Sequence, residues 1–127
     1  YLISSGKIYI SDLGIRNNRV GYDDNDIAGL MENMVYMELL FRGKEAAVGK
    51  INDNEVDFIV IGTEKKEYYQ VTTDLLDPKV KEREVGALKK VDDMFPKTII
   101  TLNRYPSNYI DGIRVIPLVD FLLEEFE

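Results

Sequence analysis

EVDFIVI at positions 55–61, together with YYQVT at positions 68–72, is the stretch that decides the fold we expect. β-Branched and aromatic residues crowd both runs, and the charged segment 62–66 between them begins with a glycine, so we predict two strands joined by a turn. Both runs are apolar on both faces, which is typical of central strands in a sheet. A turn over 62–65 would have even length and fix the pairing of the two strands.

Three polar side chains interrupt these apolar strands. With the even-length turn, Asp57 lies opposite Gln70, on the face that also carries Ile59 and Tyr68, and Thr72 joins the same polar patch. A carboxylate in a buried strand is costly unless a positive or hydrogen-bonding group meets it. The patch is therefore either a functional site or a buried network in which the amide and the hydroxyl satisfy the carboxylate.

The composition narrows the chemistry. The chain has 127 residues, 45% of them hydrophobic, which is enough for one globular domain over residues 1–127. It has no cysteine, which excludes disulfides and thiolate metal sites, and no histidine, which excludes histidine bases and histidine-bound zinc. Oxygen ligands remain, and these favour hard cations such as Mg²⁺, Mn²⁺ or Ca²⁺.

Charge and hydropathy constrain the partners. The 16 basic and 23 acidic residues give a net charge of −7, which argues against strong non-specific adhesion to nucleic acid but is compatible with a local basic surface. No apolar run has the length of a membrane span, and no signal pattern opens the sequence, so we expect a cytoplasmic protein without a membrane partner. Because Tyr1 begins the sequence in mid-pattern, we expect a domain of a longer polypeptide.

Hydrophobic periodicity and turn residues outline the remaining elements. A helix apolar around most of its circumference is expected to end at Gly43, and a second helix to begin with Asp77 as N-cap and Pro78 in its first position. The predicted elements are strands at 7–10, 46–50, 55–61, 68–72, 98–102 and 113–117, and helices at 27–42, 78–94 and 118–125. Their order predicts an α/β fold with a mixed sheet and helices on both faces.

Two acids interrupt the first predicted helix. Glu32 lies in its early turns, where the helix dipole favours a carboxylate, and shares a face with Val35 and Leu39. Its simplest interpretation is an acid near a helix start. Glu38 lies on another side, either solvated or paired with Arg42 four residues later.

Three motifs, in this order, resemble the signature of the PD-(D/E)XK nuclease superfamily, which has the restriction-endonuclease-like fold. GLMEN at 29–33 and LLFRG at 39–43 are similar to the first helix of archaeal Holliday-junction resolvases, with a glycine before the acid and another at the helix end. Asp57 matches the aspartate of the second motif. Gln70 and Thr72 stand at the acid and lysine positions of the third. This resemblance implies a three-layer α/β/α core.

Nearly the whole chain also resembles the uncharacterised C-terminal domain of prokaryotic AAA-type ATPases. The resemblance rests on ISDLGIRN at 10–17, on Glu32-Asn33, on EVDF at 55–58 and on Gln70-Val71. It implies a P-loop ATPase domain in the same polypeptide as the partner of this chain. DNA is a further partner implied by the nuclease resemblance.

Active members of the PD-(D/E)XK superfamily hydrolyse phosphodiesters with Mg²⁺ or Mn²⁺, so the resemblance implies this reaction. By resemblance, Glu32, Asp57 and Gln70 occupy the metal-ligand positions, and Arg83 is a candidate phosphate contact whose simpler interpretation is an ion pair with a neighbouring glutamate. Gln70 offers only a neutral oxygen and Thr72 cannot replace an ammonium group. Losing one preorganised charge stabiliser typically costs about 10²–10³-fold in rate.

We therefore expect a degenerate nuclease-fold module that acts as a binding or regulatory domain of an ATPase. The first alternative is a weak Mg²⁺- or Mn²⁺-dependent DNA endonuclease with a relocated cation, for which Lys50, Lys65 and Lys66 are candidates, although the last two resemble solvated turn residues. The second alternative is a protein-docking or self-association domain, which the acidic balance and aromatic residues such as Tyr105, Tyr109 and Phe126 favour.

Overall fold

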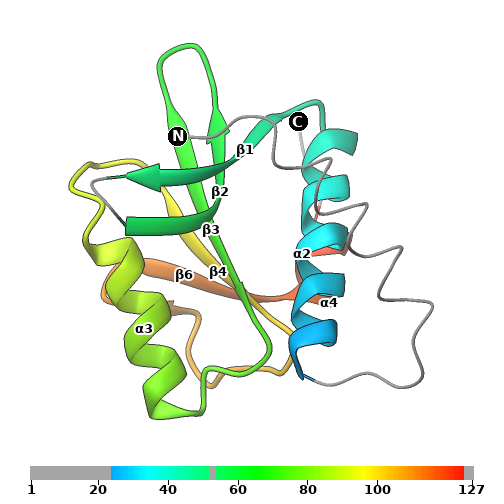
Figure 1. The fold of residues 1–127 in the computed structure, drawn as a ribbon, viewed down its shortest axis with the longest axis vertical. Helices are drawn as coiled ribbons and strands as arrows, with labels where there is room; N and C mark the ends of the chain where they lie inside the picture. The colour runs from blue at the N-terminus through cyan, green and yellow to red at the C-terminus, as the bar shows by residue number, and fades with distance from the viewer. Residues whose placement is uncertain (1–23, 52–53, 125–127) are drawn as a thin grey trace.

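A mixed six-stranded sheet with three helices forms the part of the chain that the computed structural model describes, residues 24–51 and 54–124 (Figure 1). The elements, in chain order, are α2 (Asp24–Phe41), β1 (Glu45–Ile51), β2 (Asn54–Ile61), β3 (Lys66–Thr72), α3 (Pro78–Lys89), β4 (Lys97–Thr101), β5 (Tyr109–Ile110), β6 (Ile113–Pro117) and α4 (Leu118–Leu123). The α/β class and the mixed sheet are confirmed. The strand expected at 7–10 lies outside the described residues.

The strands follow the order β1-β2-β3-β4-β6-β5 across the sheet. β1, β2 and β3 form an antiparallel meander, whereas β3, β4 and β6 run parallel, and β5 closes the far edge antiparallel to β6. Parallel neighbours need a crossover connection, and α3 supplies it between β3 and β4. β3 therefore lies where the antiparallel and parallel halves of the sheet meet.

The register of the β2–β3 hairpin is the predicted one. Ile61 pairs with Lys66 and Ile59 with Tyr68, and the Gly62 N–H donates to the Lys65 carbonyl oxygen at 2.8 Å to close the four-residue turn. The ladder ends at the pair Phe58 and Tyr69. Asp57 and Gln70 therefore lie directly beyond the last backbone pair, where the two strands begin to separate.

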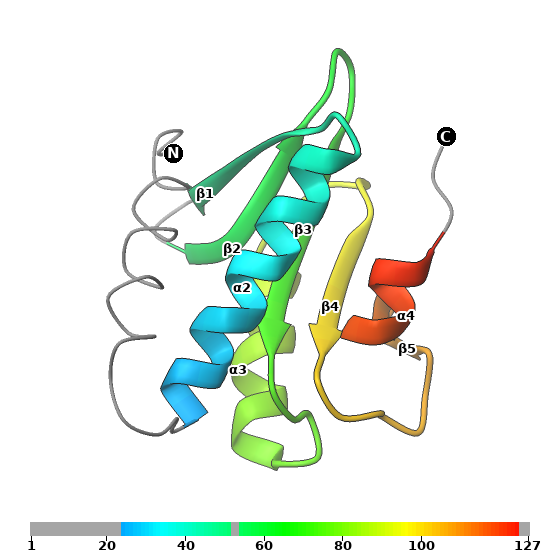
Figure 2. The ribbon, with the colours of Figure 1, turned by 90° about the vertical axis from the view of Figure 1, so that its right-hand side faces the viewer.

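Two hydrophobic clusters form, because successive residues of each strand point to opposite sides of the sheet. One cluster joins α2 and α4 to the sheet through residues such as Val35, Phe58 and Phe121. The other joins α3 to the sheet through residues such as Ile59 and Leu88. Figure 2, a view turned by 90°, shows α2 and α4 in front of the strands and α3 behind them.

α2 begins at Asp24, three residues before the expected start at Ile27, and two other elements differ more from the sequence expectation. α3 ends at Lys89 rather than near Met94, which is 98% exposed in the connection to β4. β5 is a strand of only two residues, formed because Asp111 and Gly112, with φ of 50° and 83°, make the tight turn that returns the chain into β6. A strand so short has no periodicity, but its Asp-Gly turn was a usable signal.

No helix among the described residues is long and apolar enough to cross a membrane.

Candidate functional site

Asp57 and Gln70 replace the backbone ladder where β2 and β3 separate. The Asp57 Oδ2 atom accepts a hydrogen bond from the Val71 N–H at 2.8 Å. In the reverse direction, the Asp57 N–H donates to the Gln70 Oε1 atom at 2.7 Å. Each of the two motif side chains thus accepts a hydrogen bond from a backbone N–H group of the opposite strand. Asp57 and Gln70 meet across the two strands, as predicted. The hydrogen bonds differ from the predicted network, because the backbone N–H of Val71 meets the Asp57 carboxyl and the Gln70 side chain accepts from the Asp57 backbone.

The electrostatic environment of Asp57 disfavours its charge. The pKa of its carboxyl is raised from 3.8 to about 8. Burial is the largest cause, the negative charges of Glu32, Glu84 and Glu55 also raise it, and the hydrogen bond from Val71 lowers it. A carboxyl group with such a pKa is mainly protonated at neutral pH. It is consequently a poor anionic ligand until a cation offsets its surroundings.

Glu32 reaches this environment from α2. Its charge is the second largest cause of the raised pKa of Asp57, so the two predicted acids lie within electrostatic range of each other. Glu32 nevertheless does not line the cavity beside Asp57. The two predicted acids therefore interact electrostatically, but of the two only Asp57 lines the cavity.

A cavity of about 690 Å³ lies between the diverging strands and α3. Asp57 and Gln70 line its sheet side, and α3 contributes both charge signs to its other side. The charged lining residues from α3 and its C-cap are Lys79, Glu82, Arg83, Glu84 and Lys90. Arg83, the candidate phosphate contact, does line the cavity, but its Nε atom lies 3.2 Å from Glu84 Oε1, and its side chain is 71% exposed. The ion pair expected as its simpler interpretation is present.

Glu84 is the residue that sequence reasoning missed. It is buried, with 8% of its surface exposed, and this burial raises the pKa of its carboxyl. The missed signal is its spacing, because it lies four residues after Val80 and four before Leu88, in the apolar stripe of α3. An acid in such a stripe faces the sheet, and here its charge acts on Asp57.

The remaining motif position adds no charge. Thr72 is buried in β3, where it pairs with Thr101 of β4, and it does not line the cavity. Lys65 and Lys66 are exposed at the hairpin turn, as expected of solvated turn residues. The side chain of Lys50 lies outside the described part of the structure.

The residues that the structure describes do not fit a metal centre as they stand. No group of three or more aspartate, glutamate, histidine or cysteine residues among them is arranged to hold an ion. Asp57 Oδ2 and Gln70 Oε1 are both already engaged by backbone N–H groups. Bound Mg²⁺ or Mn²⁺ would thus compete with the hydrogen bonds that hold β2 to β3.

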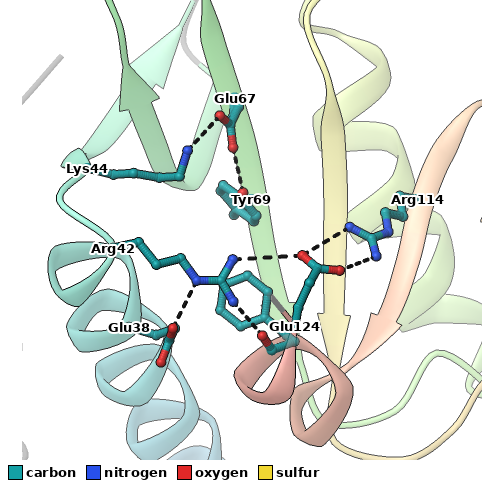
Figure 3. A network of polar contacts seen from close by, with 8 residues as sticks. Glu38, Arg42, Lys44, Glu67, Tyr69, Arg114 and Glu124 are labelled. Atoms are coloured by element: carbon teal, nitrogen blue, oxygen red, sulfur yellow. Dashed lines mark hydrogen bonds and ion pairs between the residues drawn. The ribbon is translucent and has the colours of Figure 1, made fainter. Parts of the chain in front are cut away.

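A second polar cluster lies at the other end of α2 (Figure 3). Arg42 Nε donates to Glu38 at 2.9 Å, and its guanidinium also donates to the Phe121 carbonyl oxygen and lies 4.4 Å from the centre of the Phe121 ring. Glu124 pairs with both Arg42 and Arg114. The predicted pairing of Glu38 with Arg42 is confirmed. These ion pairs join α2, α4 and β6, so the cluster is structural.

Two of the aromatic residues considered for docking lie in the described region. Tyr105 is half-buried, and its ring centre lies 5.6 Å from the Lys81 ammonium nitrogen. Tyr109 in β5 is 62% exposed. Phe126 lies outside the described residues.

Comparison with known proteins gives one informative relative. The chain is 36% identical over 124 residues to an uncharacterized protein of Haemophilus influenzae, and the match covers 98% of this chain. The chain spans only about 30% of the length of that relative. No protein-family model and no solved structure matches the chain.

Proposed function

We propose that the chain is a degenerate PD-(D/E)XK nuclease-fold module that serves a P-loop ATPase domain of the same polypeptide by binding or regulation. The observation that carries this proposal is a reciprocal pair of hydrogen bonds: the Asp57 carboxyl accepts from the β3 backbone, and the Gln70 side chain accepts from the β2 backbone. In this arrangement the two motif side chains hold strands together. A neutral carboxyl and a neutral amide are weak ligands for a divalent cation.

The proposed fold is a three-layer α/β/α arrangement of the restriction-endonuclease-like type. It is supported by the two core clusters, which contain α2 and α4 on one side of the sheet and α3 on the other. A role within a longer polypeptide is supported by the Haemophilus relative, which is about three times as long as the matched region.

Incubation of the 127-residue chain with supercoiled and branched DNA in Mn²⁺ tests the proposal. We expect no cleavage above that of an Asp57→Ala variant and no calorimetric Mn²⁺ binding. Cleavage by the wild-type chain that Asp57→Ala abolishes would overturn the proposal. The same assay with Glu32→Ala would then show whether both predicted acids participate.

The second candidate is a weak Mg²⁺- or Mn²⁺-dependent DNA endonuclease. It is favoured by one observation, the convergence of charge from Glu32 and Glu84 on Asp57 beside a cavity that Lys79 and Arg83 also line. Under this alternative, Glu84→Gln would lower cleavage, whereas Asp92→Asn, which changes an exposed acid that does not line the cavity, would leave it unchanged.

A further inference from the structure

A second cavity, of about 430 Å³, lies where the ends of α2 and α4 meet the starts of β3, β4 and β6. It shares no lining residue with the cavity beside Asp57. The charged residues that line it are four bases and two acids: Arg42, Lys44, Lys97, Arg114, Glu67 and Glu124. In a chain with a net charge of −7, this is a local basic surface of the kind that the composition allows.

Glu124 lies between two arginines of this cavity (Figure 3). Its carboxylate accepts two hydrogen bonds from Arg114. Arg42 Nη1 lies 3.7 Å from Glu124 Oε1, which is an ion pair longer than a hydrogen bond. A carboxylate has two oxygen atoms, and here Arg114 engages both of them. A group with a third oxygen atom would approach Arg42 more closely.

The position of Arg42 does not depend on Glu124. Its Nε atom donates to Glu38, and its guanidinium donates to the Phe121 carbonyl oxygen and lies over the Phe121 ring. The Arg42 side chain is only 5% exposed. These contacts hold the guanidinium at the cavity wall, so a ligand would meet a preorganised cation there.

Glu124 itself is not favoured by the helix that carries it. It is the C-cap of α4, a helix of six residues. The free carbonyl groups in the last turn of a helix disfavour a carboxylate beside them. The Glu124 side chain is also 30% exposed. Glu124 therefore occupies the space between the arginines as an internal anion that an external anion can replace.

The charge left behind by Glu124 would favour such a replacement. Lys97 does not contribute, because its ammonium donates to the Asp93 carboxylate and to backbone carbonyl oxygens. Without Glu124, three positive and two negative charges remain in the cluster: Arg42, Lys44, Arg114, Glu38 and Glu67. An oxyanion would offset this excess of positive charge.

We propose that this cavity binds a phosphoryl group, as inorganic phosphate or a phosphate monoester, between Arg42 and Arg114, and that Glu124 fills the same place when the ligand is absent. This binding site goes beyond the proposed function, which concerns the other cavity. The planar guanidinium matches phosphate oxygens with paired N–H groups. A phosphoryl group has at least three terminal oxygens, enough to accept from both arginines.

Titration of the 127-residue chain with inorganic phosphate at neutral pH, with chloride keeping the ionic strength constant, tests the proposal. We expect the amide signals of residues 42–44 and 112–114 to shift and those of residues 85–89 in α3 to stay in place. Glu124→Gln should tighten phosphate binding by about tenfold, as expected for a site that the carboxylate fills about nine-tenths of the time.

Added substitutions in the Glu124→Gln chain show which arginines act. Arg114→Gln should abolish the shifts. Arg104→Gln should leave the phosphate affinity unchanged, because Arg104 is exposed and does not line the cavity. The unshifted signals of α3 report that each variant is folded.

Two further titrations identify the ligand. Acetate should bind at least about tenfold more weakly than phosphate, because it lacks the third oxygen. Glycerol 2-phosphate is compared with inorganic phosphate, and the tighter of the two shows whether the site prefers a monoester or the free anion. Equal phosphate affinity of wild type and Glu124→Gln, absence of shifts in Glu124→Gln, or equal binding of acetate would overturn the proposal.

Discussion

Asp57 is held by two hydrogen bonds whose directions oppose each other across the β2–β3 gap. Its carboxyl accepts from β3 and its amide donates to the side chain of Gln70. The acceptor role lowers the pKa of the carboxyl, but burial raises it more. The carboxyl of Asp57 therefore helps to hold β2 to β3 and is less available to bind a metal ion. Its protonation state should affect the stability of the fold.

Asp57→Asn should reduce the pH dependence of stability. Because the folded pKa of about 8 exceeds the ordinary value of 3.8, the folded chain holds a proton that the unfolded chain releases, and stability falls as pH rises between these values. We expect wild type to lose about 4 kcal/mol more than the variant between pH 5 and pH 9, because stability falls by about 1.4 kcal/mol per pH unit between pH 5 and the folded pKa of about 8. Urea unfolding of both proteins at several pH values measures this difference in stability. Parallel profiles for the two proteins would contradict this assignment.

Gln70→Glu should make the fold responsive to Mn²⁺. Gln70 is 5% exposed, and a buried carboxyl beside Asp57 should cost about 2 kcal/mol of folding free energy without divalent ions. Mn²⁺ should recover part of that loss, because the variant regains an anionic ligand. The unfolding temperature of the variant, measured once with a chelator and once with Mn²⁺, tests this expectation. Gln70→Ala is the control without a ligand, and equal stabilisation of wild type by Mn²⁺ would refute the reasoning.

At the scale of elements, local signals and distant contacts stabilise different helices. α3 starts at an N-cap that the sequence predicts. The Asp77 Oδ1 atom accepts a hydrogen bond from the Lys79 N–H at 2.9 Å, and Pro78 follows the cap. α2 is fixed at its end by Arg42, whose partners include the backbone of α4, 79 residues away in sequence. The first stabilisation is local and the second depends on the assembled fold.

Asp77→Ala should lower the free energy of unfolding by about 1 kcal/mol, because the first turn of α3 loses its side-chain acceptor. Urea unfolding measures this change. Glu82→Ala, at an exposed position of the same helix, should change it by less than about 0.5 kcal/mol. Equal changes in the free energy of unfolding for the two substitutions would show that the Asp77 cap does not stabilise α3.

Arg42→Lys should destabilise the fold by about 3 kcal/mol. The side chain is 5% exposed, and a lysine cannot serve the Glu38 carboxylate, the Phe121 carbonyl oxygen and the Phe121 ring together. Arg104→Lys is the matched control, since Arg104 pairs with Asp120 through a side chain that is 75% exposed, and should cost less than about 0.5 kcal/mol. Calorimetric unfolding of both variants decides whether burial sets the difference.

For the whole molecule, the acidic balance limits contact with nucleic acid. With a net charge of −7, we expect duplex DNA to bind more weakly than roughly 10⁻⁴ M at physiological salt. Fluorescence anisotropy over a range of salt concentrations measures this. Tighter binding that the triple variant Lys79→Ala, Arg83→Ala, Lys90→Ala abolishes would place DNA at the α3 cavity and favour the endonuclease alternative.

The sequence by itself determined the β2–β3 hairpin, the meeting of Asp57 with Gln70 and the start of α3. These features follow from short-range rules, because an even turn length fixes the side-chain register of a hairpin and a capping residue acts within one helical turn. The same rules located the first helix and its end at Gly43, whose φ of 78° suits glycine.

Only the tertiary structure decided which residues surround Asp57. Glu84 reaches it from a helix that follows β3, and Glu32 from a helix that precedes β1, and no local period states which helix face meets which strand. The burial that raises the pKa of Asp57 likewise depends on how α3 packs over the sheet. Packing over long sequence separations sets the charge of the site, whereas local periodicity sets its position on the strands.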